Sequence, residues 1–184
     1  MRVADAPYEG RSRYDSGEDC VTEESTPVEP LFDVPRIPAS AGALIFDGED
    51  RLLILKPNYK KGWTIPGGQI DANGESPWDA CRREAHEECG LLITRGKLVC
   101  VDFLRPRPRR PGGLRFLFHC GTVSDRQLRA IKLQESEIDE HRFAGLEDAK
   151  ALLSGPVARR VQAAVGAKRC LYLEDGRPVG GIRR

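Results

Sequence analysis

The feature that most constrains the fold is the segment 76–90, for which the sequence predicts one amphipathic helix. Ser76 is a good N-cap residue, Pro77 suits the first helical position, and Gly90 follows the helix as a C-terminal stop. Apolar side chains recur along one stripe of this helix, at Trp78, Cys81, Ala85 and Cys89. Such a stripe has to pack on another element, so we expect the helix to cover one side of a sheet.

The same helix carries three carboxylates on one face. Glu84, Glu87 and Glu88 are spaced i, i+3 and i+4, and like charges at this spacing destabilise an isolated helix by about 0.2–0.5 kcal/mol per pair. A bound cation would reverse that effect, and ligands that offer only oxygen suit Mg²⁺ or Mn²⁺. Arg83 lies one turn before Glu87 and is able to hold that carboxylate. Taken alone, the pattern also fits an ordinary charged face exposed to solvent.

The rest of the chain predicts a mixed α/β domain. Two β-rich runs, 41–46 and 52–55, flank an Asp-Gly turn and predict a hairpin. Further expected elements are strands at 63–65, 97–104 and 114–122, helices at 146–153 and 157–167, and a C-terminal hairpin at 170–179. Strands interleaved with helices, including one early hairpin, favour a mixed sheet with helices on its faces.

The length of 184 residues favours one domain with tails. Residues 1–30 hold three arginines against eight acidic residues and few core-forming side chains, so we expect 1–35 to be an acidic arm that is disordered or extended. Residues 36–184 then form the domain. The six cysteines include no C-x-x-C pair, which favours buried reduced thiols over a zinc site or disulfides.

Charge and hydropathy limit the expected partners and location. The formal net charge is +1, which gives no global attraction to nucleic acid or to an anionic membrane. No apolar run is long enough for a signal peptide or a membrane span. We therefore expect a cytoplasmic protein that binds neither nucleic acid nor membrane.

The segment from Gly67 to Leu91 closely resembles the Nudix box. It contains Gly67-Gly68, then Gly74-Glu75, then after seven residues Arg83-Glu84-Ala85-His86-Glu87-Glu88-Cys89-Gly90-Leu91. In the family pattern a glycine is followed after five residues by glutamate, after seven more by Arg-Glu, and then by Glu-Glu and a final glycine. One departure is that six residues, not five, separate Gly68 from Glu75.

The resemblance implies an α/β/α sandwich over about residues 36–170, and hydrolysis of a nucleoside diphosphate linked to another group. Carried over by position, Glu84 and Glu88 are the first candidates for metal ligands. Glu87 comes next, and the carbonyl group of Gly67 is a candidate backbone ligand. Arg83 and Glu75 would orient the helix acids, although the longer turn puts the placement of Glu75 in question. A divalent ion, Mg²⁺ or Mn²⁺, would activate the attacking water.

A carboxylate must also accept a proton from that water. Members of the family supply this base either from the box helix or from a loop elsewhere. Glu137, six residues before Phe143, is the candidate outside the helix. The acidic run 135–140 that contains it also fits a solvated turn.

Several residues outside the box are candidates for substrate binding. Arg107, Arg109 and Arg110 are suited to phosphate groups, although their loop also fits an exposed hairpin tip. Lys61 and Trp63 precede the glycines and are expected beside the site, while a tryptophan in this position is also common in a core. The expected partner is a small nucleotide-like diphosphate, and the family makes a homodimer plausible. Two alternatives stay open, a non-catalytic nucleotide-binding sensor and a sanitising nucleoside triphosphate pyrophosphohydrolase.

Overall fold

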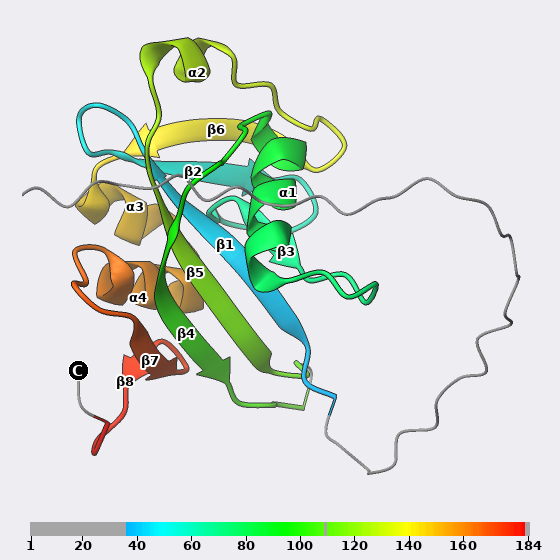
Figure 1. Ribbon diagram of the computed structural model, residues 1–184, viewed down its shortest axis with the longest axis vertical. Coiled ribbons are helices and arrows are strands. Elements are labelled where there is room, and N and C mark those ends of the chain that lie inside the picture. Colours follow the sequence, from blue (N-terminus) through cyan, green and yellow to red (C-terminus); the bar gives the residue numbers. More distant parts are fainter. Residues whose placement is uncertain (1–35, 109, 183–184) are drawn as a thin grey trace, which may run out of the picture. The chain divides into compact units, whose positions relative to one another are not determined.

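A mixed sheet of eight strands forms the centre of the computed structural model (Figure 1). The structure describes residues 36–108 and 110–182, so the expected N-terminal arm and Arg109 lie outside the described residues. The strands are β1 (Ala39–Phe46), β2 (Leu52–Pro57), β3 (Gly67–Gln69), β4 (Lys97–Leu104), β5 (Gly113–Thr122), β6 (Ile138–Ala144), β7 (Leu171–Glu174) and β8 (Arg177–Pro178).

Strand order in the sheet is β6-β2-β1-β5-β4-β7-β8, with β3 paired to β1 outside this path. The pairs β1–β5 and β4–β7 are parallel, and the other pairs are antiparallel. The predicted hairpin of β1 and β2 is present, but its strands soon separate: β1 continues along β3 and β5, and β2 along β6. The predicted mixed sheet is therefore confirmed.

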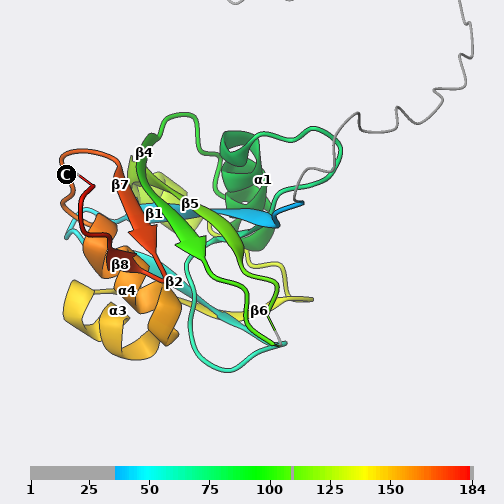
Figure 2. The ribbon, with the colours of Figure 1, turned by 90° about the horizontal axis from the view of Figure 1, so that it is seen from below.

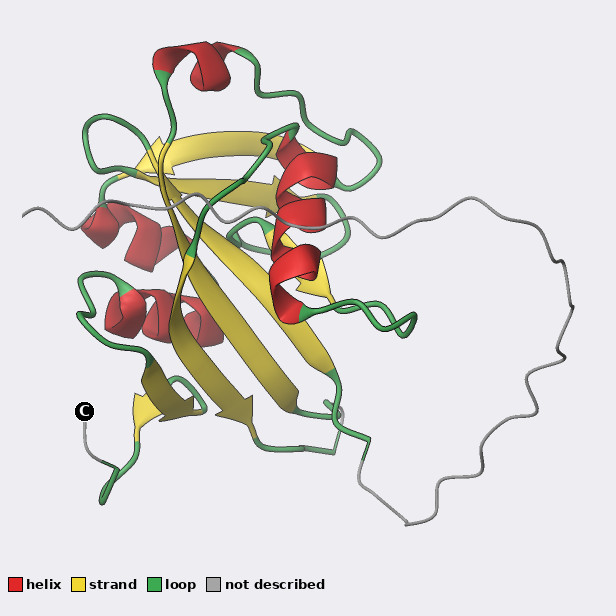
Figure 3. Cartoon of the chain, in the orientation of Figure 1, coloured by secondary structure: helices red, strands yellow, loops and turns green. Residues whose placement is uncertain are grey.

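Helices cover both faces of this sheet (Figures 2 and 3). Helix α1 (Pro77–Cys89) lies on one face, and α3 (Leu146–Leu152) and α4 (Gly155–Ala164) lie on the other. Side chains of β1 alternate between the two layers, since Ala43 and Ile45 join the core under α1 whereas Leu44 and Phe46 join the opposite core. The fold is the α/β/α sandwich that the sequence predicts.

The predicted limits of α1 are observed. The Ser76 hydroxyl accepts a hydrogen bond from the backbone N–H of Asp79 at 3.1 Å, and Pro77 is the first residue of the helix. Gly90 has φ 71° and donates its N–H to carbonyls of the last turn, a conformation that favours glycine. The stripe of Cys81, Ala85 and Cys89 is fully buried, which fixes the orientation of the helix on the sheet.

Four elements differ from the sequence prediction. The acidic run 135–140, for which a loop or a solvated turn was expected, is a turn only at 135–137 and then enters β6, an edge strand. The short helix α2 (Asp125–Arg129) was not predicted. Instead of a strand, residues 63–65 contribute only isolated bridges, Thr64 to Leu55 and Trp63 to Leu153. The regular strand in this region is β3, whose sequence Gly-Gly-Gln has little intrinsic strand preference.

In the described part of the chain, the cysteines follow the prediction with one exception, while Cys20 lies outside the described residues. Cys81, Cys89 and Cys100 are buried and free, and Cys120 is half-buried. Cys170 is exposed, which corrects the expectation of burial, because it precedes β7 at the surface. None of the helices in the described part of the chain has the length and apolar character needed to cross a membrane.

Candidate active site

Two consecutive glycines bring β3, β1 and α1 into close contact. Gly67 pairs with Gly42 and Gly68 with Ala41 in the antiparallel ladder. Gly67 has φ 145°, and a β-carbon there would collide with the carbonyl of Ala41. A β-carbon on Gly68 would collide with the carboxylate of Glu84. The glycines therefore allow the carboxylates of α1 to lie directly on the backbone of β3.

Glu88 is the buried member of the acidic face, with 3% of its surface exposed. Its Oε2 accepts a hydrogen bond of 2.7 Å from the Gly67 N–H. Burial raises the pKa of Glu88 to about 8, and the charges of Glu84 and Glu137 act in the same direction, whereas the Gly67 N–H and Lys60 lower it. A nearby cation would relieve this penalty.

Glu84 and Glu137 share that electrostatic environment. Burial raises the pKa of Glu84, Arg83 lowers it, and the charge of Glu137 raises it further. Glu137 is exposed, and its carbonyl accepts a hydrogen bond of 2.9 Å from the Asn58 N–H. The Gln134 N–H donates to the Glu88 carbonyl at 3.2 Å, so the segment that carries Glu137, nearly fifty residues away in sequence, lies beside α1.

Arg83 connects the carboxylates around it. It donates to Glu75 at 2.8 and 3.1 Å, to Glu84 at 2.9 Å and to Glu87 at 2.9 Å. A fourth partner is the Gln69 carbonyl, at 2.9 Å. This arrangement holds the helix acids in place and ties α1 to β3.

The longer turn before Glu75 leaves that residue paired with Arg83. The extra residue is accommodated in a turn where Gly74 has φ 91° and the Asn73 side chain accepts a hydrogen bond of 3.0 Å from the Glu75 N–H. Oε2 of Glu75 also accepts a hydrogen bond of 2.9 Å from the Asp71 N–H. Arg83 and this N–H lower the pKa of Glu75, so its carboxylate is ionised.

Oxygen donors for a divalent cation are present at this site. Among the described residues no three acidic, histidine or cysteine side chains already converge in a metal-binding arrangement, because Glu84 and Glu87 contact Arg83. Mg²⁺ keeps several waters and needs only one or two protein carboxylates. The buried Glu88, repelled by Glu84 and Glu137, is a carboxylate that a cation would stabilise. The donor set therefore fits Mg²⁺ or Mn²⁺.

A cavity of about 330 Å³ adjoins the glycines. Besides Gly67 and Gly68, the residues suited to a nucleotide in its lining are Tyr59, Lys60, Gln69, Arg115, Phe116 and Arg160. They supply aromatic surfaces for a base and positive charge for phosphates. We call this the catalytic cavity.

Arg160 was missed by the sequence prediction. It is 6% exposed, and its Nε donates to Oδ2 of the fully buried Asp102 at 2.8 Å. Oδ1 of Asp102 accepts a hydrogen bond of 2.9 Å from the Gly176 N–H. The available signal was that Arg160 interrupts the apolar stripe of α4, next to Val161 and one turn before Ala164.

The structure does not bring every predicted substrate residue to the catalytic cavity. Lys61 is exposed and lines no described cavity, while its neighbour Lys60 does line the catalytic cavity. Trp63 is 9% exposed in the core under α3 and α4, with the guanidinium of Arg142 5.0 Å from its ring. Burial therefore removes Trp63 from the set of substrate contacts.

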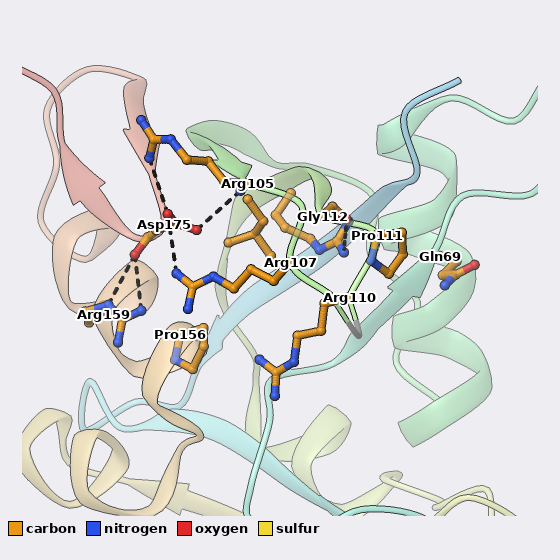
Figure 4. Close-up of a pocket in the computed structure, with 11 residues that line it drawn as sticks. Gln69, Arg105, Arg107, Arg110, Pro111, Gly112, Pro156, Arg159 and Asp175 are labelled. Carbon is orange, nitrogen blue, oxygen red and sulfur yellow. Dashed lines mark hydrogen bonds and ion pairs between the residues drawn. The ribbon is translucent and has the colours of Figure 1, made fainter. Parts of the chain in front are cut away.

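Arg107 and Arg110 line a second cavity of about 340 Å³ (Figure 4). We call it the arginine cavity. Gln69 and Arg115 line both cavities, which are therefore adjacent. Arg109, the third predicted arginine of this loop, lies outside the described residues.

Comparisons with known proteins agree with this geometry. A family model described as NUDIX domain matches residues 36–164, and no curated protein matches the sequence. A NUDIX hydrolase from Nitrosomonas europaea has a similar structure, with TM-score 0.59, 21% identity, and coverage of 81% of this chain and 97% of that chain. The NUDIX domain of Shewanella oneidensis NrtR, complexed with ADP ribose, has TM-score 0.60, 16% identity, and coverage of 72% and 88%. A C. elegans Ap4A hydrolase has TM-score 0.51, 24% identity, and coverage of 68% and 97%.

Proposed function

This chain belongs to the Nudix family and is a Nudix pyrophosphohydrolase, and we propose that it cleaves the diphosphate linkage of a nucleoside diphosphate joined to another group. One observation supports this most directly. The buried carboxylate of Glu88 accepts a hydrogen bond from the Gly67 N–H. Gly67 lines a cavity that is also lined by Lys60, Arg115 and Arg160. The acidic side chains and the positively charged residues suited to phosphate therefore lie next to the same glycines.

We assign a divalent cation, Mg²⁺ or Mn²⁺, to Glu84 and Glu88, with Glu87 and the Gly67 carbonyl as further ligands. When bound there, the cation supplies charge neutralisation for the diphosphate and lowers the pKa of a water molecule. The Gly67 N–H holds Glu88 in position. Arg83, itself held by Glu75, positions Glu84 and Glu87.

The reaction needs an acceptor for the proton of the attacking water, and we assign this role to Glu137. Two observations support this assignment: its side chain is exposed, and its charge raises the pKa of both Glu84 and Glu88. Water attacks phosphorus, Glu137 accepts a proton, and the bond to the bridging oxygen of the diphosphate breaks. Removing a general base of this kind lowers the rate by about 10²–10⁴-fold.

The nucleotide part of the substrate is assigned to the catalytic cavity. Tyr59 and Phe116 offer surfaces on which a base can stack, and Lys60 and Arg115 offer positive charge to phosphates. Two proteins of similar fold support a nucleotide ligand, since one was solved with ADP ribose and another is an Ap4A hydrolase. We therefore propose a substrate that combines a nucleoside, a diphosphate and a second group.

The proposal is tested by incubating the full chain with Mg²⁺ or Mn²⁺ and a panel of nucleoside diphosphate sugars, dinucleoside polyphosphates and nucleoside triphosphates. We expect release of a nucleoside monophosphate from at least one linked diphosphate. In H₂¹⁸O the label should enter a phosphate product, because water attacks phosphorus. Glu88→Gln should abolish turnover, while Glu147→Gln, which changes an 88% exposed side chain on α3, should leave it unchanged.

Absence of any phosphate product across the panel would overturn the proposal. Tight binding of a nucleotide by calorimetry without product would identify the chain as a sensor instead. Turnover of nucleoside triphosphates alone would identify a sanitising enzyme. Glu137→Gln separates the roles of the acids, since it should lower kcat while Mn²⁺ affinity is retained, whereas Glu88→Gln should weaken Mn²⁺ binding itself.

A further inference from the structure

The arginine cavity is lined by an unusual excess of positive charge. Its lining contains Arg105, Arg107, Arg110, Arg115, Arg159 and a single carboxylate, Asp175. Its volume of about 340 Å³ is within the range of small-ligand sites. The residues come from the β4–β5 loop, β5, α4 and the turn between β7 and β8, so the fold assembles them from distant segments.

The carboxylates around the cavity do not balance these guanidinium groups. Asp175 Oδ2 lies 3.3 Å from Arg105 and 3.6 Å from Arg107, and Arg105 also pairs with Glu174. Arg159 donates only to the main-chain carbonyl of Asp175, at 3.2 Å. Among the described residues, five guanidinium groups thus face two carboxylates, which leaves an excess of three positive charges.

Arg110 and Arg115 account for much of this excess. In the described part of the chain, no carboxylate lies within 4.0 Å of either guanidinium group. Arg115 is half-buried and donates only to the carbonyls of Leu114 and Gly112, at 2.9 and 3.1 Å. Burial and the neighbouring Arg160 lower the pKa of Arg115, so its charge is held at a cost that an anion would offset.

The loop that carries Arg107 and Arg110 has a defined shape. The two residues exchange backbone hydrogen bonds of 2.8 and 2.9 Å, and residues opposed in this way project their side chains to the same side. Figure 4 shows the Arg107 side chain directed toward Asp175. Gly112 has φ 77° and no space for a β-carbon, so the backbone fixes where the loop returns to β5.

The arginine cavity adjoins the catalytic cavity. Gln69 and Arg115 line both cavities, and the Gln69 carbonyl accepts a hydrogen bond from Arg83 at 2.9 Å. A substrate bound at the glycines of β3 therefore lies next to residues that also line the arginine cavity.

We infer that the arginine cavity binds a phosphate group that the substrate carries in addition to its scissile diphosphate. This inference rests on the proposed function. Guanidinium groups bind phosphate with paired hydrogen bonds, and a phosphomonoester carries nearly two negative charges at neutral pH. Two charges offset most of the excess, whereas a single carboxylate would offset only one. The substrate class is thus a nucleoside diphosphate derivative with a further phosphate.

The experiment compares substrates that differ by one phosphate. NADH and NADPH form one pair, dephospho-coenzyme A and coenzyme A form a second, and dinucleoside polyphosphates of increasing length form a series. The wild-type chain should favour the more phosphorylated member of at least one pair or of the series. Arg107→Ala/Arg110→Ala should reduce that preference by about 10- to 100-fold, mainly through KM.

Two further variants keep the result interpretable. Arg126→Ala/Arg129→Ala removes the same charge from exposed positions on α2 and should leave the preference unchanged. Arg110→Lys keeps the charge without the paired donors and should retain part of the preference. Arg107 is 65% exposed, so the cavity variant should melt at the wild-type temperature.

The outcomes separate this inference from the proposed function. If the wild-type chain hydrolyses linked diphosphates but shows no preference for the added phosphate, the inference is wrong and the proposed function stands. A second contrary result is a rate that inorganic phosphate or pyrophosphate changes only when Arg107 and Arg110 are intact, with no preference for the more phosphorylated substrate. The arginine cavity then binds a free effector, and the inference is also wrong. If no substrate is hydrolysed, calorimetry on Glu88→Gln with the same pairs still reports whether the added phosphate strengthens binding through the arginines.

Discussion

At the scale of single residues, Glu88 is held in an environment that opposes its ionisation. The folded protein raises its pKa to about 8 from an ordinary value of 4.5, chiefly through burial. The protonated form is therefore favoured by folding. Its contribution to stability is complete below about pH 4.5 and is lost as the pH rises through about 8.

We therefore predict that the chelator-treated protein loses thermal stability between pH 5 and pH 8.5, and that Mg²⁺ restores it at the upper end. Thermal melts followed by circular dichroism at constant ionic strength measure this. Glu88→Gln, which cannot ionise, serves as the control and should remove most of the pH dependence. A wild-type melting temperature that is constant over this range would contradict the assignment.

The backbone of Gly68 leads to a second prediction at the same scale. A β-carbon at this position would collide with the Glu84 carboxylate, so Gly68→Ala should displace that acid and lower the rate at least tenfold, with a change in unfolding free energy of about 1 kcal/mol or less. Gly48→Ala is the matched control, because a β-carbon there has no neighbour within 4 Å. Equal rates for the two variants would show that the close contact of the Glu84 carboxylate with the Gly68 backbone does not affect the reaction rate.

At the scale of elements, Asp102 joins three parts of the fold. It lies fully buried on β4, pairs with Arg160 of α4, and accepts the Gly176 N–H from the turn between β7 and β8. Removing one partner of a buried ion pair leaves the other charge without compensation. The position of Arg160 in the catalytic cavity and the attachment of the C-terminal hairpin thus depend on one carboxylate.

We predict that Asp102→Ala lowers the free energy of unfolding by about 3–5 kcal/mol, as measured by urea denaturation. Asp102→Ala/Arg160→Met should recover part of that loss, since no unpaired charge remains. Asp125→Ala, an exposed change on α2, should have an effect within about 0.5 kcal/mol. If the double variant were no more stable than Asp102→Ala, the uncompensated charge of Arg160 would not be the cause.

The elements that the sequence predicts correctly carry strong local signals. Helix α1 has a cap, a stop and an apolar stripe, and β4 and β5 are apolar runs with turn residues between them. Helix α2 carries a capping box of Ser124 and Gln127 that the prediction overlooked, whereas the missed strands β6 and β3 lack such signals. Strand β6 lies at the sheet edge and keeps only Ile138 and Ala144 buried, so its charged residues look like a turn. Strand β3 forms because it pairs with β1, and the intrinsic strand propensity of its own residues gives no sign of that pairing.

The residues of the candidate site likewise fall into those that the sequence predicts and those that it does not. Glu75, Arg83, Glu84, Glu87 and Glu88 lie within one continuous motif, and the structure brings them together as the motif predicts. Contacts from elsewhere in the chain, such as those of Arg115 and Arg160 with the catalytic cavity, arise from tertiary packing. A sequence read segment by segment contains no direct signal for that packing.

At the scale of the whole molecule, the described contacts fall within one unit, Arg36–Arg184. We predict that a chain shortened to these residues melts at the temperature of the full chain and keeps its kcat and KM. Differential scanning calorimetry and the phosphate-release assay check this. A lower melting temperature or a changed KM would show that residues 1–35 take part in the fold or in the site, contrary to the division at residue 35.

The parallel pairing of β1 with β5 has a consequence for the time at which the site forms. The partners Ala39 and Leu114 are 75 positions apart in the sequence, and contacts between such distant residues slow folding because a long loop must close first. Strand β3 and helix α1 pack on β1. Because the motif at 67–91 precedes β5 in the sequence, we expect its residues to be synthesised before β1 can pair with β5, and the site to be completed only after that pairing.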